Sequence, residues 1–81
     1  MNYLHNNLSR LRKYHNMTQA DAAERLGIAR SRYAGWESGA AEPSINMLIN
    51  LRDMYKVGFN VMLVMELTPL SDDELDRLMK P

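Results

Sequence analysis

The sequence predicts an all-α fold in which short helices surround one core. Through most of the 81 residues, apolar side chains recur every three or four positions, which is the spacing of one helix face. Residues that favour helix ends stand between these stretches: Thr18, Ser44 and Ser71 as N-caps and Gly27 as a C-cap. A chain of this length forms one small domain, so we expect a single modest hydrophobic core.

The first predicted helix runs from residue 6 or 7 to about residue 15. Leu4, Leu8 and Leu11 form its apolar stripe at helical spacing. His5 and His15 flank this helix, and because they stand ten positions apart in a chain without cysteine, we expect surface residues and no metal site.

The second and third predicted helices are joined by a short turn. Thr18 caps a helix over residues 19–26, and Gly27 ends it because glycine adopts the left-handed conformation without strain. Ile28 follows at once, and another helix then runs to about Ser38. Two helices joined by a glycine-containing turn of about three or four residues form a helix-turn-helix, whose second helix enters the major groove of DNA.

The fourth predicted helix follows Glu42-Pro43 and has Ser44 as its N-cap. We expect its inward face to consist of Ile45, Leu48, Ile49 and Tyr55. Three further apolar residues widen this arc beyond the needs of one core: Met47, Leu51 and Met54.

Residues 59–67 are almost continuously apolar, and the residues alone leave helix and strand both open because the run is short and rich in valine. After Thr68-Pro69, a capping box at Ser71–Glu74 opens a last short helix. Its apolar face holds Leu75, Leu78 and Met79. A helix of this length is marginal alone, so it must dock on the rest of the protein or fray.

The net charge is zero, but the two halves of the chain differ. Residues 1–39 hold six basic and three acidic side chains, a net charge of +3, whereas residues 40–81 hold four and seven, a net charge of −3. The basic half is the half with the helix-turn-helix, which suits a surface that faces phosphates.

Composition also bears on location and on enzymatic activity. The absence of cysteine fits a reducing cytoplasm, the apolar run 61–65 is too short to span a membrane, and no signal-peptide core is present. No nucleophile elbow or phosphate-binding loop occurs, so we expect neither an enzyme nor a cofactor.

Residues 18–44, T-Q-A-D-A-A-E-R-L-G-I-A-R-S-R-Y-A-G-W-E-S-G-A-A-E-P-S, resemble the helix-turn-helix of the Cro and cI-type phage repressors, the family also called xenobiotic-response-element-like regulators. With Leu11-Arg12 in the preceding helix, the resemblance extends over residues 8–63. It implies a five-helix repressor-like DNA-binding domain at 1–67, with a helix rather than a strand at 59–67, followed by a short helical tail at 68–81.

A helical wheel assigns the faces of the third predicted helix. We expect one side, with Ala29, Tyr33, Trp36 and Glu37, to face the domain. The other side holds Ser31, Ala34, Gly35 and Ser38, with Arg30 and Arg32 flanking it, and we expect it to face DNA.

The resemblance implies base readout at Arg30, Ser31 and Gly35. Arg30 can pair with guanine through two hydrogen bonds, and Ser31 can bond donor or acceptor edges. Gly35 offers no side chain but allows close approach of the backbone. Arg32 replaces a residue that is small and polar in the family, and it can reach a base or a phosphate.

The resemblance also implies phosphate contacts at Thr18, Gln19 and Ser38. The loop 40–42 departs from the family pattern because relatives often have lysine or arginine there, and the loss of such contacts makes dimerisation more necessary. Arg12 and Glu37 match a family ion pair that joins the first helix to the third, and its expected role is orientation rather than net stability.

The partners expected from these observations are double-stranded DNA and a second copy of the chain. The surplus of apolar side chains predicts a homodimer interface at Phe59, Met62, Leu63 and Met65, which would present two recognition helices to a palindromic operator. One hypothesis is therefore a transcriptional repressor. The other is a protein-interaction module, such as an antitoxin that binds a toxin through its methionine-rich face or acidic tail, and the two hypotheses are compatible.

Overall fold

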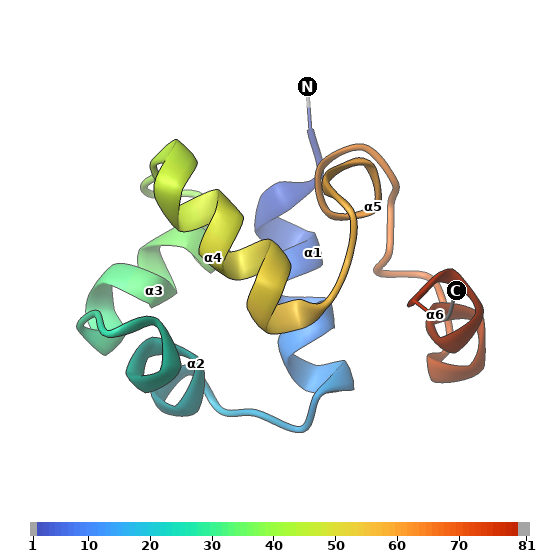
Figure 1. The fold of residues 1–81 in the computed structure, drawn as a ribbon, viewed down its shortest axis with the longest axis horizontal. Helices are drawn as coiled ribbons and strands as arrows, with labels where there is room; N and C mark the ends of the chain where they lie inside the picture. The colour runs from blue at the N-terminus through green and yellow to red at the C-terminus, as the bar shows by residue number, and fades with distance from the viewer. Residues whose placement is uncertain (1, 80–81) are drawn as a thin grey trace.

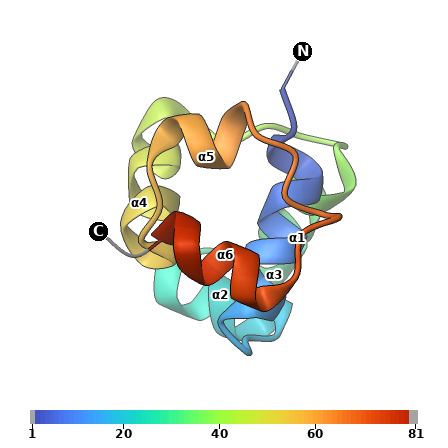
Figure 2. The same ribbon diagram turned by 90° about the vertical axis from the view of Figure 1, so that its right-hand side faces the viewer.

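Six α-helices and no strand make up residues 2–79, the part of the chain that the computed structural model describes (Figure 1). In chain order they are α1 (Leu4–Tyr14), α2 (Gln19–Leu26), α3 (Arg30–Ser38), α4 (Ile45–Tyr55), α5 (Phe59–Leu63) and α6 (Asp72–Met79). The predicted all-α fold is confirmed. Helices α1 to α5 surround the core, and α6 lies at the end of the molecule opposite α2 and α3 (Figures 1 and 2).

The capping residues expected from the sequence lie at the ends of these helices. The Thr18 and Ser44 hydroxyls accept hydrogen bonds from the amides of Asp21 and Met47, at 3.0 and 3.2 Å. Gly27 has a φ of +72°, the left-handed conformation in which glycine carries no Cβ penalty. Ser71 and Glu74 form the predicted capping box at the start of α6. Local side-chain chemistry therefore fixes where these helices begin and end.

Residues 59–67, which the sequence alone could assign neither to a helix nor to a strand, contain one short helix. α5 covers Phe59–Leu63, so a helix there is confirmed, but its extension to residue 67 is wrong. The chain turns at Val64, where the Met65 amide bonds the carbonyl of Asn60 at 3.2 Å. The turn lets Leu67 enter the core with none of its surface exposed.

The core is formed mainly by large side chains of α1, α3, α4 and α5, with one contribution from α6. Its fully buried apolar members include Leu8, Leu11, Tyr33, Trp36, Leu51, Tyr55, Met62, Leu67 and Leu75. The inward orientation expected for Ile45 is wrong, because this first residue of α4 is 76% exposed while Leu51, expected to be surplus, is fully buried. The later turns of α4, rather than its first residue, therefore contact the core.

α1 begins at Leu4, earlier than the predicted start at residue 6 or 7. Asn7 therefore lies inside the helix and not at its start. The Asn7 amide bonds the carbonyl of Tyr3 inside the helix, and its side chain is fully buried. The Asn7 Nδ2 donates to the carbonyls of Met62 at 2.8 Å and Met65 at 2.6 Å, and its Oδ1 accepts from the Leu67 amide at 3.0 Å. This one side chain replaces the backbone partners that the chain loses where α5 ends.

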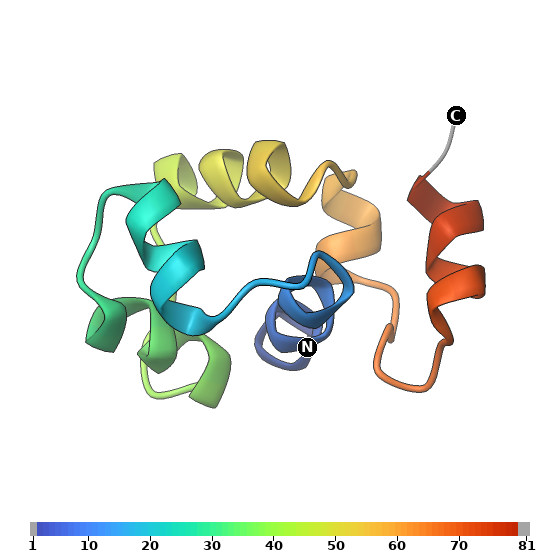
Figure 3. The same cartoon turned by 90° about the horizontal axis from the view of Figure 1, so that it is seen from below.

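The tail helix α6 lies at one end of the molecule (Figure 3), and polar side chains of α1 hold it there. Arg10 donates to the Leu70 carbonyl at 2.9 Å and forms an ion pair with Asp72 at 2.7 Å. The Tyr14 hydroxyl donates to the Asp76 carboxylate, which raises the pKa of Tyr14. Between these two polar contacts, Leu75 enters the core. The tail therefore completes the core at the end of the molecule away from α3.

We expect Asn7→Leu to destabilise the fold by about 2–3 kcal/mol, because it leaves buried backbone groups without partners. Urea denaturation followed by circular dichroism measures this. Asn6→Leu is the matched control on the exposed side of the same helix, and its effect should stay within about 0.5 kcal/mol. Equal stability of the two variants would show that Asn7 does not hold the turn after α5.

Candidate nucleic-acid interface

The second helix of the α2–α3 pair is exposed to solvent through its N-cap and first turn, residues 29–32. α2 and α3 are joined by residues 27–29, where the Ile28 amide bonds the carbonyl of Ala23 at 3.0 Å. Ala29 is the N-cap of α3, with extended backbone and no side-chain cap bond. The inward orientation expected for Ala29 is wrong, because a residue outside the helical conformation does not follow a helical wheel and this one is exposed.

The large aromatic residues of α3 face the domain, as the helical wheel predicts. Tyr33 and Trp36 are 0% and 1% exposed and pack into the domain. The first turn carries Arg30, Ser31 and Arg32, all exposed. Two positive charges and a hydroxyl therefore point to solvent at the amino end of α3.

Arg32 lies back along its own helix. Its guanidinium carbon is 5.6 Å from the centre of the Trp36 ring, a cation–π contact. Within residues 2–79, no hydrogen bond or ion pair engages the side chains of Arg30 and Ser31. Of the two arginines in this turn, Arg30 is therefore the one that can extend toward a ligand without leaving the ring of Trp36.

Gly35 and Ser38 lie where the loop after α3 folds back. The Gly35 carbonyl accepts from the Ala41 amide at 3.2 Å and from the Ser38 hydroxyl at 3.2 Å. A Cβ at position 35 would lie 3.8 Å from the Cβ of Ala41, an ordinary contact. Gly35 is half-buried beneath this loop, so its surroundings leave less open surface than the wheel suggested.

The Glu37 carboxylate joins three helices. The Arg12 guanidinium of α1 donates to it through two nitrogens, at 2.7 and 3.2 Å, and the Gln19 amide of α2 donates at 3.0 Å. Arg12 also donates to the Met17 carbonyl at 2.9 Å, which holds the chain between α1 and α2. The pair expected to orient the third helix therefore lies at the junction of α1, α2 and α3.

Burial would raise the pKa of Glu37, but hydrogen bonds from Arg12, Tyr33 and Gln19 outweigh it and hold the pKa below its usual value. The hydrogen bond to Glu37 likewise raises the pKa of Arg12. The side chains of Arg12 and Glu37 are 13% and 7% exposed, so water screens this pair little. The pair stays ionised through the neutral range and keeps a defined geometry.

A pair of tyrosine hydroxyls, which sequence reasoning missed, connects α3 to α4. The hydroxyls of Tyr33 and Tyr55 lie 2.5 Å apart and both rings are fully buried. Burial raises the pKa of Tyr33 well above its usual range and that of Tyr55 to about 12. No local pattern in the sequence pairs Tyr33 with Tyr55, because the two residues are 22 positions apart.

The amino end of α2 holds the two residues expected to contact phosphate, and each already has an internal partner. The Thr18 amide donates to the Asp21 carboxylate at 2.9 Å, a bond that lowers the pKa of Asp21. The Gln19 side chain donates to Glu37. The backbone amides of Gln19 and Ala20 precede the first i→i−4 bond of α2, from Ala22 to Thr18, and they point out of the helix end.

The residues expected at a dimer interface divide into exposed and buried members. Phe59 and Met65 are each 36% exposed, and Leu63 is half-buried. Met62 has no exposed surface, so it belongs to the core of the protomer. Val64, which was not predicted, is 68% exposed beside Met65. The guanidinium of Arg52 lies 4.8 Å from the Phe59 ring centre and covers part of it.

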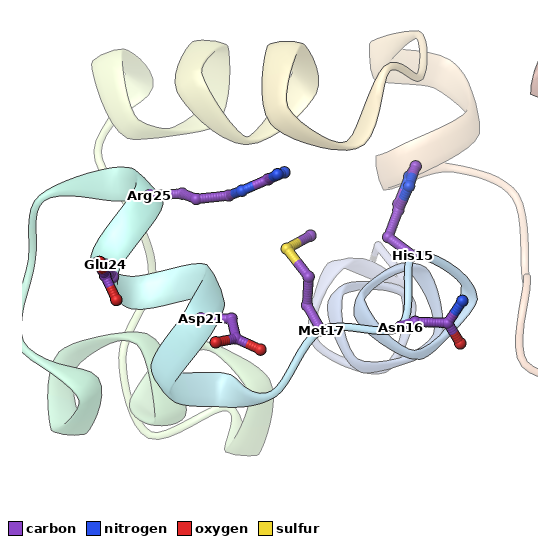
Figure 4. A pocket seen from close by; sticks show the side chains of 6 residues that line it. All are labelled: His15, Asn16, Met17, Asp21, Glu24 and Arg25. Carbon is purple, nitrogen blue, oxygen red and sulfur yellow. The ribbon is translucent and has the colours of Figure 1, made fainter.

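An open cavity of about 550 Å³ lies between the carboxyl end of α1 and α2 (Figure 4). Its lining consists of His15, Asn16, Met17, Asp21, Glu24 and Arg25. Charges of both signs border it, and no buried polar side-chain atom of residues 2–79 lacks a hydrogen-bond partner. This hollow therefore offers no buried, unpaired group with which to hold a ligand.

The two histidines are not the simple surface residues expected. Each is half-buried and its ring forms a hydrogen bond with a backbone carbonyl: His5 with that of Trp36 at 2.9 Å, and His15 with that of Tyr55 at 3.0 Å.

No group of three or more histidine, cysteine or acidic side chains gathers into a metal site within the described part of the chain. No helix between residues 2 and 79 is long and apolar enough to cross a membrane.

Comparison with known proteins identifies relatives of this arrangement. A family model described as "Helix-turn-helix" matches residues 8–61. The chain is 36% identical over 70 residues to the uncharacterized HTH-type transcriptional regulator YobD of Bacillus subtilis (strain 168), an alignment that covers 86% of this chain and 61% of that protein.

Two further relatives come from the same organism. The uncharacterized HTH-type transcriptional regulator YqaE is 37% identical over 57 residues (70% of this chain, 49% of the relative), and the HTH-type transcriptional regulator AnsR is 46% identical over 48 residues (59% and 41%). The chain thus spans about half the length of these relatives. No solved structure matches it.

The lowered pKa of Glu37 predicts how stability depends on pH. Because the pKa is lower in the folded protein than the ordinary 4.5, the ionised carboxylate stabilises the fold above about pH 4.5, and this stabilisation is lost as the pH falls through the folded value. Glu37→Gln should be about 1–3 kcal/mol less stable at neutral pH and should lose less stability on acidification. Urea titrations across the acid range measure this, with exposed Glu42→Gln as the control. Parallel acid limbs for wild type and Glu37→Gln would contradict the assignment.

Proposed function

Since the chain belongs to the Cro/C1-type helix-turn-helix family, we propose that it is a sequence-specific DNA-binding regulator of transcription, and specifically a repressor that binds a palindromic operator as a homodimer. The observation that carries the proposal is the exposed, basic first turn of α3 on a helix whose far side is anchored by Tyr33, Trp36 and Glu37. A reading surface on a rigid support is what direct readout in the major groove requires.

In the proposed complex, Arg30 reads a guanine through two hydrogen bonds and Ser31 bonds a neighbouring base edge. Arg32 has two available roles, since it can stay over Trp36 or leave it to reach a base or phosphate. Gly35 lets the backbone of α3 approach the groove closely. The ion pair of Arg12 and Glu37 sets the angle at which α3 enters.

Phosphate contacts in this proposal come from the amino end of α2 and from the end of α3. The outward amides of Gln19 and Ala20 and the positive end of the α2 dipole suit a phosphate oxygen. The exposed Thr18 and Ser38 hydroxyls are the side chains that we assign to phosphate contacts at these two helix ends. The carboxylate of Asp21 weakens this positive end, and the loop 40–42 adds no positive charge, so a single domain holds DNA weakly.

Dimerisation offsets that weakness because it doubles the contacts with the operator. We propose an interface around α5 built from Phe59, Leu63 and Met65, with exposed Val64 added and Met62 supporting it from the core. A two-fold arrangement of this surface presents two α3 helices to major grooves about 34 Å apart. Residues 1–67 form the DNA-binding domain in this proposal, and residues 68–81 form the tail.

A second candidate function is binding of a protein partner, as in an antitoxin. The supporting observation is the acidic outer surface of α6, where Asp73, Glu74 and Leu78 are exposed at the end of the molecule away from α3. This surface can take a partner while α3 is on DNA. Neither candidate function requires catalysis or a cofactor, and both place the protein with DNA in the cytoplasm.

Selection of bound duplexes from a random-sequence library tests the proposal and supplies an operator. On that operator, Arg30→Ala should bind more weakly by about 1–3 kcal/mol and lose its preference at one base pair. Arg77→Ala, which removes the same charge from α6, is the matched control and should bind like the wild type. Equal affinity of Arg30→Ala and wild type at the same salt concentration would remove Arg30 from the readout.

We expect a homodimer in solution that Val64→Asp or Met65→Asp dissociates, because each places a charge in an apolar interface. Light scattering at tens of micromolar measures the mass, and operator binding should weaken in parallel. Ile45→Asp is the control, since it adds the same charge at an exposed apolar residue of α4. A wild-type monomer that still binds a palindrome tightly would overturn the dimer and leave the α5 surface to another protein.

A further inference from the structure

We infer that His5 is a positioning residue for α3: its imidazole caps the carboxyl end of the recognition helix from outside and thereby fixes the loop that follows. The effect on DNA binding rests on the proposed function, whereas the effect on the α3 end does not. His5 lies in the first turn of α1 and far from α3 in sequence, so no capping rule of α3 itself points to it.

The contact has two parts. The His5 Nδ1 lies 2.9 Å from the carbonyl oxygen of Trp36, in the last turns of α3. Because a carbonyl oxygen only accepts, Nδ1 must carry the proton of this bond. The face of the ring lies against Gly39, where a Cβ would come within 3.5 Å of the His5 Cδ2 and 3.7 Å of its Nε2.

The carboxyl end of α3 needs such a donor because its own amides are used elsewhere. Gly39 has a φ of +84° and turns the chain out of the helix. The Ala40 amide, which would reach the Trp36 carbonyl if the helix continued, instead donates to the Ser38 hydroxyl at 3.3 Å. The Ala41 amide donates to the Gly35 carbonyl at 3.2 Å. His5 therefore supplies the hydrogen bond that the Trp36 carbonyl lacks from the backbone.

Two anchors from α1 then define the direction of α3. Arg12 holds Glu37, and His5 holds the carbonyl of the adjacent Trp36 from the opposite end of α1. The buried rings of Tyr33 and Trp36 and the bond of Arg12 to Glu37 hold the body of α3, whereas the bond from His5 holds its carboxyl end. With both anchors, the helix and the loop at residues 39–41 keep one orientation relative to α1, and Ser38 stays in place beside them.

Three variants separate this role from packing and from helix propensity. His5→Asn keeps a donor nitrogen on Cγ, at the same place in the side chain as Nδ1, whereas His5→Leu keeps a branched side chain without a donor. Leucine favours helices more than asparagine, so propensity alone predicts that His5→Leu is the more stable. His15→Leu is the matched control, because it removes the equivalent bond of the other histidine to a carbonyl of α4.

Amide hydrogen exchange in the DNA-free protein is the first measurement. In His5→Leu, exchange at Ala40 and Ala41 should become roughly two- to tenfold faster, the factor expected for one lost hydrogen bond. His5→Asn should restore most of the protection, and His15→Leu should leave these amides unchanged. On the duplex selected by the wild type, affinity should fall by a similar factor in His5→Leu and recover in His5→Asn.

Equal exchange in the leucine and asparagine variants would overturn the inference, since the donor would then be irrelevant. Nitrogen NMR of the wild-type imidazole gives an answer even if His5→Leu fails to fold: protonation at Nδ1 supports the cap, and a neutral ring protonated only at Nε2 overturns it. If the wild type selects no DNA from the library, the proposed function fails, while exchange and NMR still decide the role of His5.

Discussion

The Glu37 carboxylate is the group on which the arrangement of the helix-turn-helix depends. Arg12 of α1, Gln19 of α2 and Tyr33, one turn earlier in α3, converge on it. A carboxylate buried this far is tolerated because these side chains donate hydrogen bonds to it. Replacing the group with an apolar residue could preserve packing, but it would remove the common point that sets α1, α2 and α3 at fixed angles. The cluster therefore contributes geometry more than net stability.

The same polar cluster extends into the core through the two tyrosines. Tyr33 contacts Glu37 on one side and the Tyr55 hydroxyl on the other, so that α4 is registered against α3 by a directional bond as well as by packing. Apolar packing alone tolerates small rotations of a helix, whereas a hydroxyl pair at 2.5 Å does not. The surface that faces solvent on α3 is consequently fixed from the buried side.

Much of this architecture could be predicted from the sequence because it depends on local signals. Thr18, Gly27 and Ser44 act on amides or on backbone conformation within a few residues of themselves, and the structure has them where they were expected. Asn7 was missed because its partners lie 55 to 60 residues away, and no local pattern distinguishes a buried asparagine from one at a helix start. The exposure of Ile45 was missed for a related reason: apolar spacing gives a stripe, but the tertiary contacts decide which part of that stripe is covered.

The candidate site could be predicted to a different extent. The family resemblance supplied the pair of Arg12 and Glu37 by position, and the helical wheel placed the first turn of α3 outside the domain. Neither gives the contact of Arg32 with Trp36, which depends on side-chain conformation, nor the cap from His5, which depends on how α1 crosses the end of α3. Local chemistry thus predicts which surface is presented, while long-range contacts decide how rigidly it is held.

α1 connects the two functional ends of the molecule, and its sequence is divided accordingly. Its apolar stripe of leucines enters the core. On one side of that stripe, His5 and Arg12 stand seven residues apart, about two helical turns, and both bond α3. On the other side, Asn7, Arg10 and Tyr14 bond the chain after α5 and the tail helix. One straight helix therefore fixes α3 relative to α5. In a dimer formed through α5, the separation of the two recognition helices follows from that relation, so half-site spacing would be encoded in the side chains of α1 as much as in the interface itself.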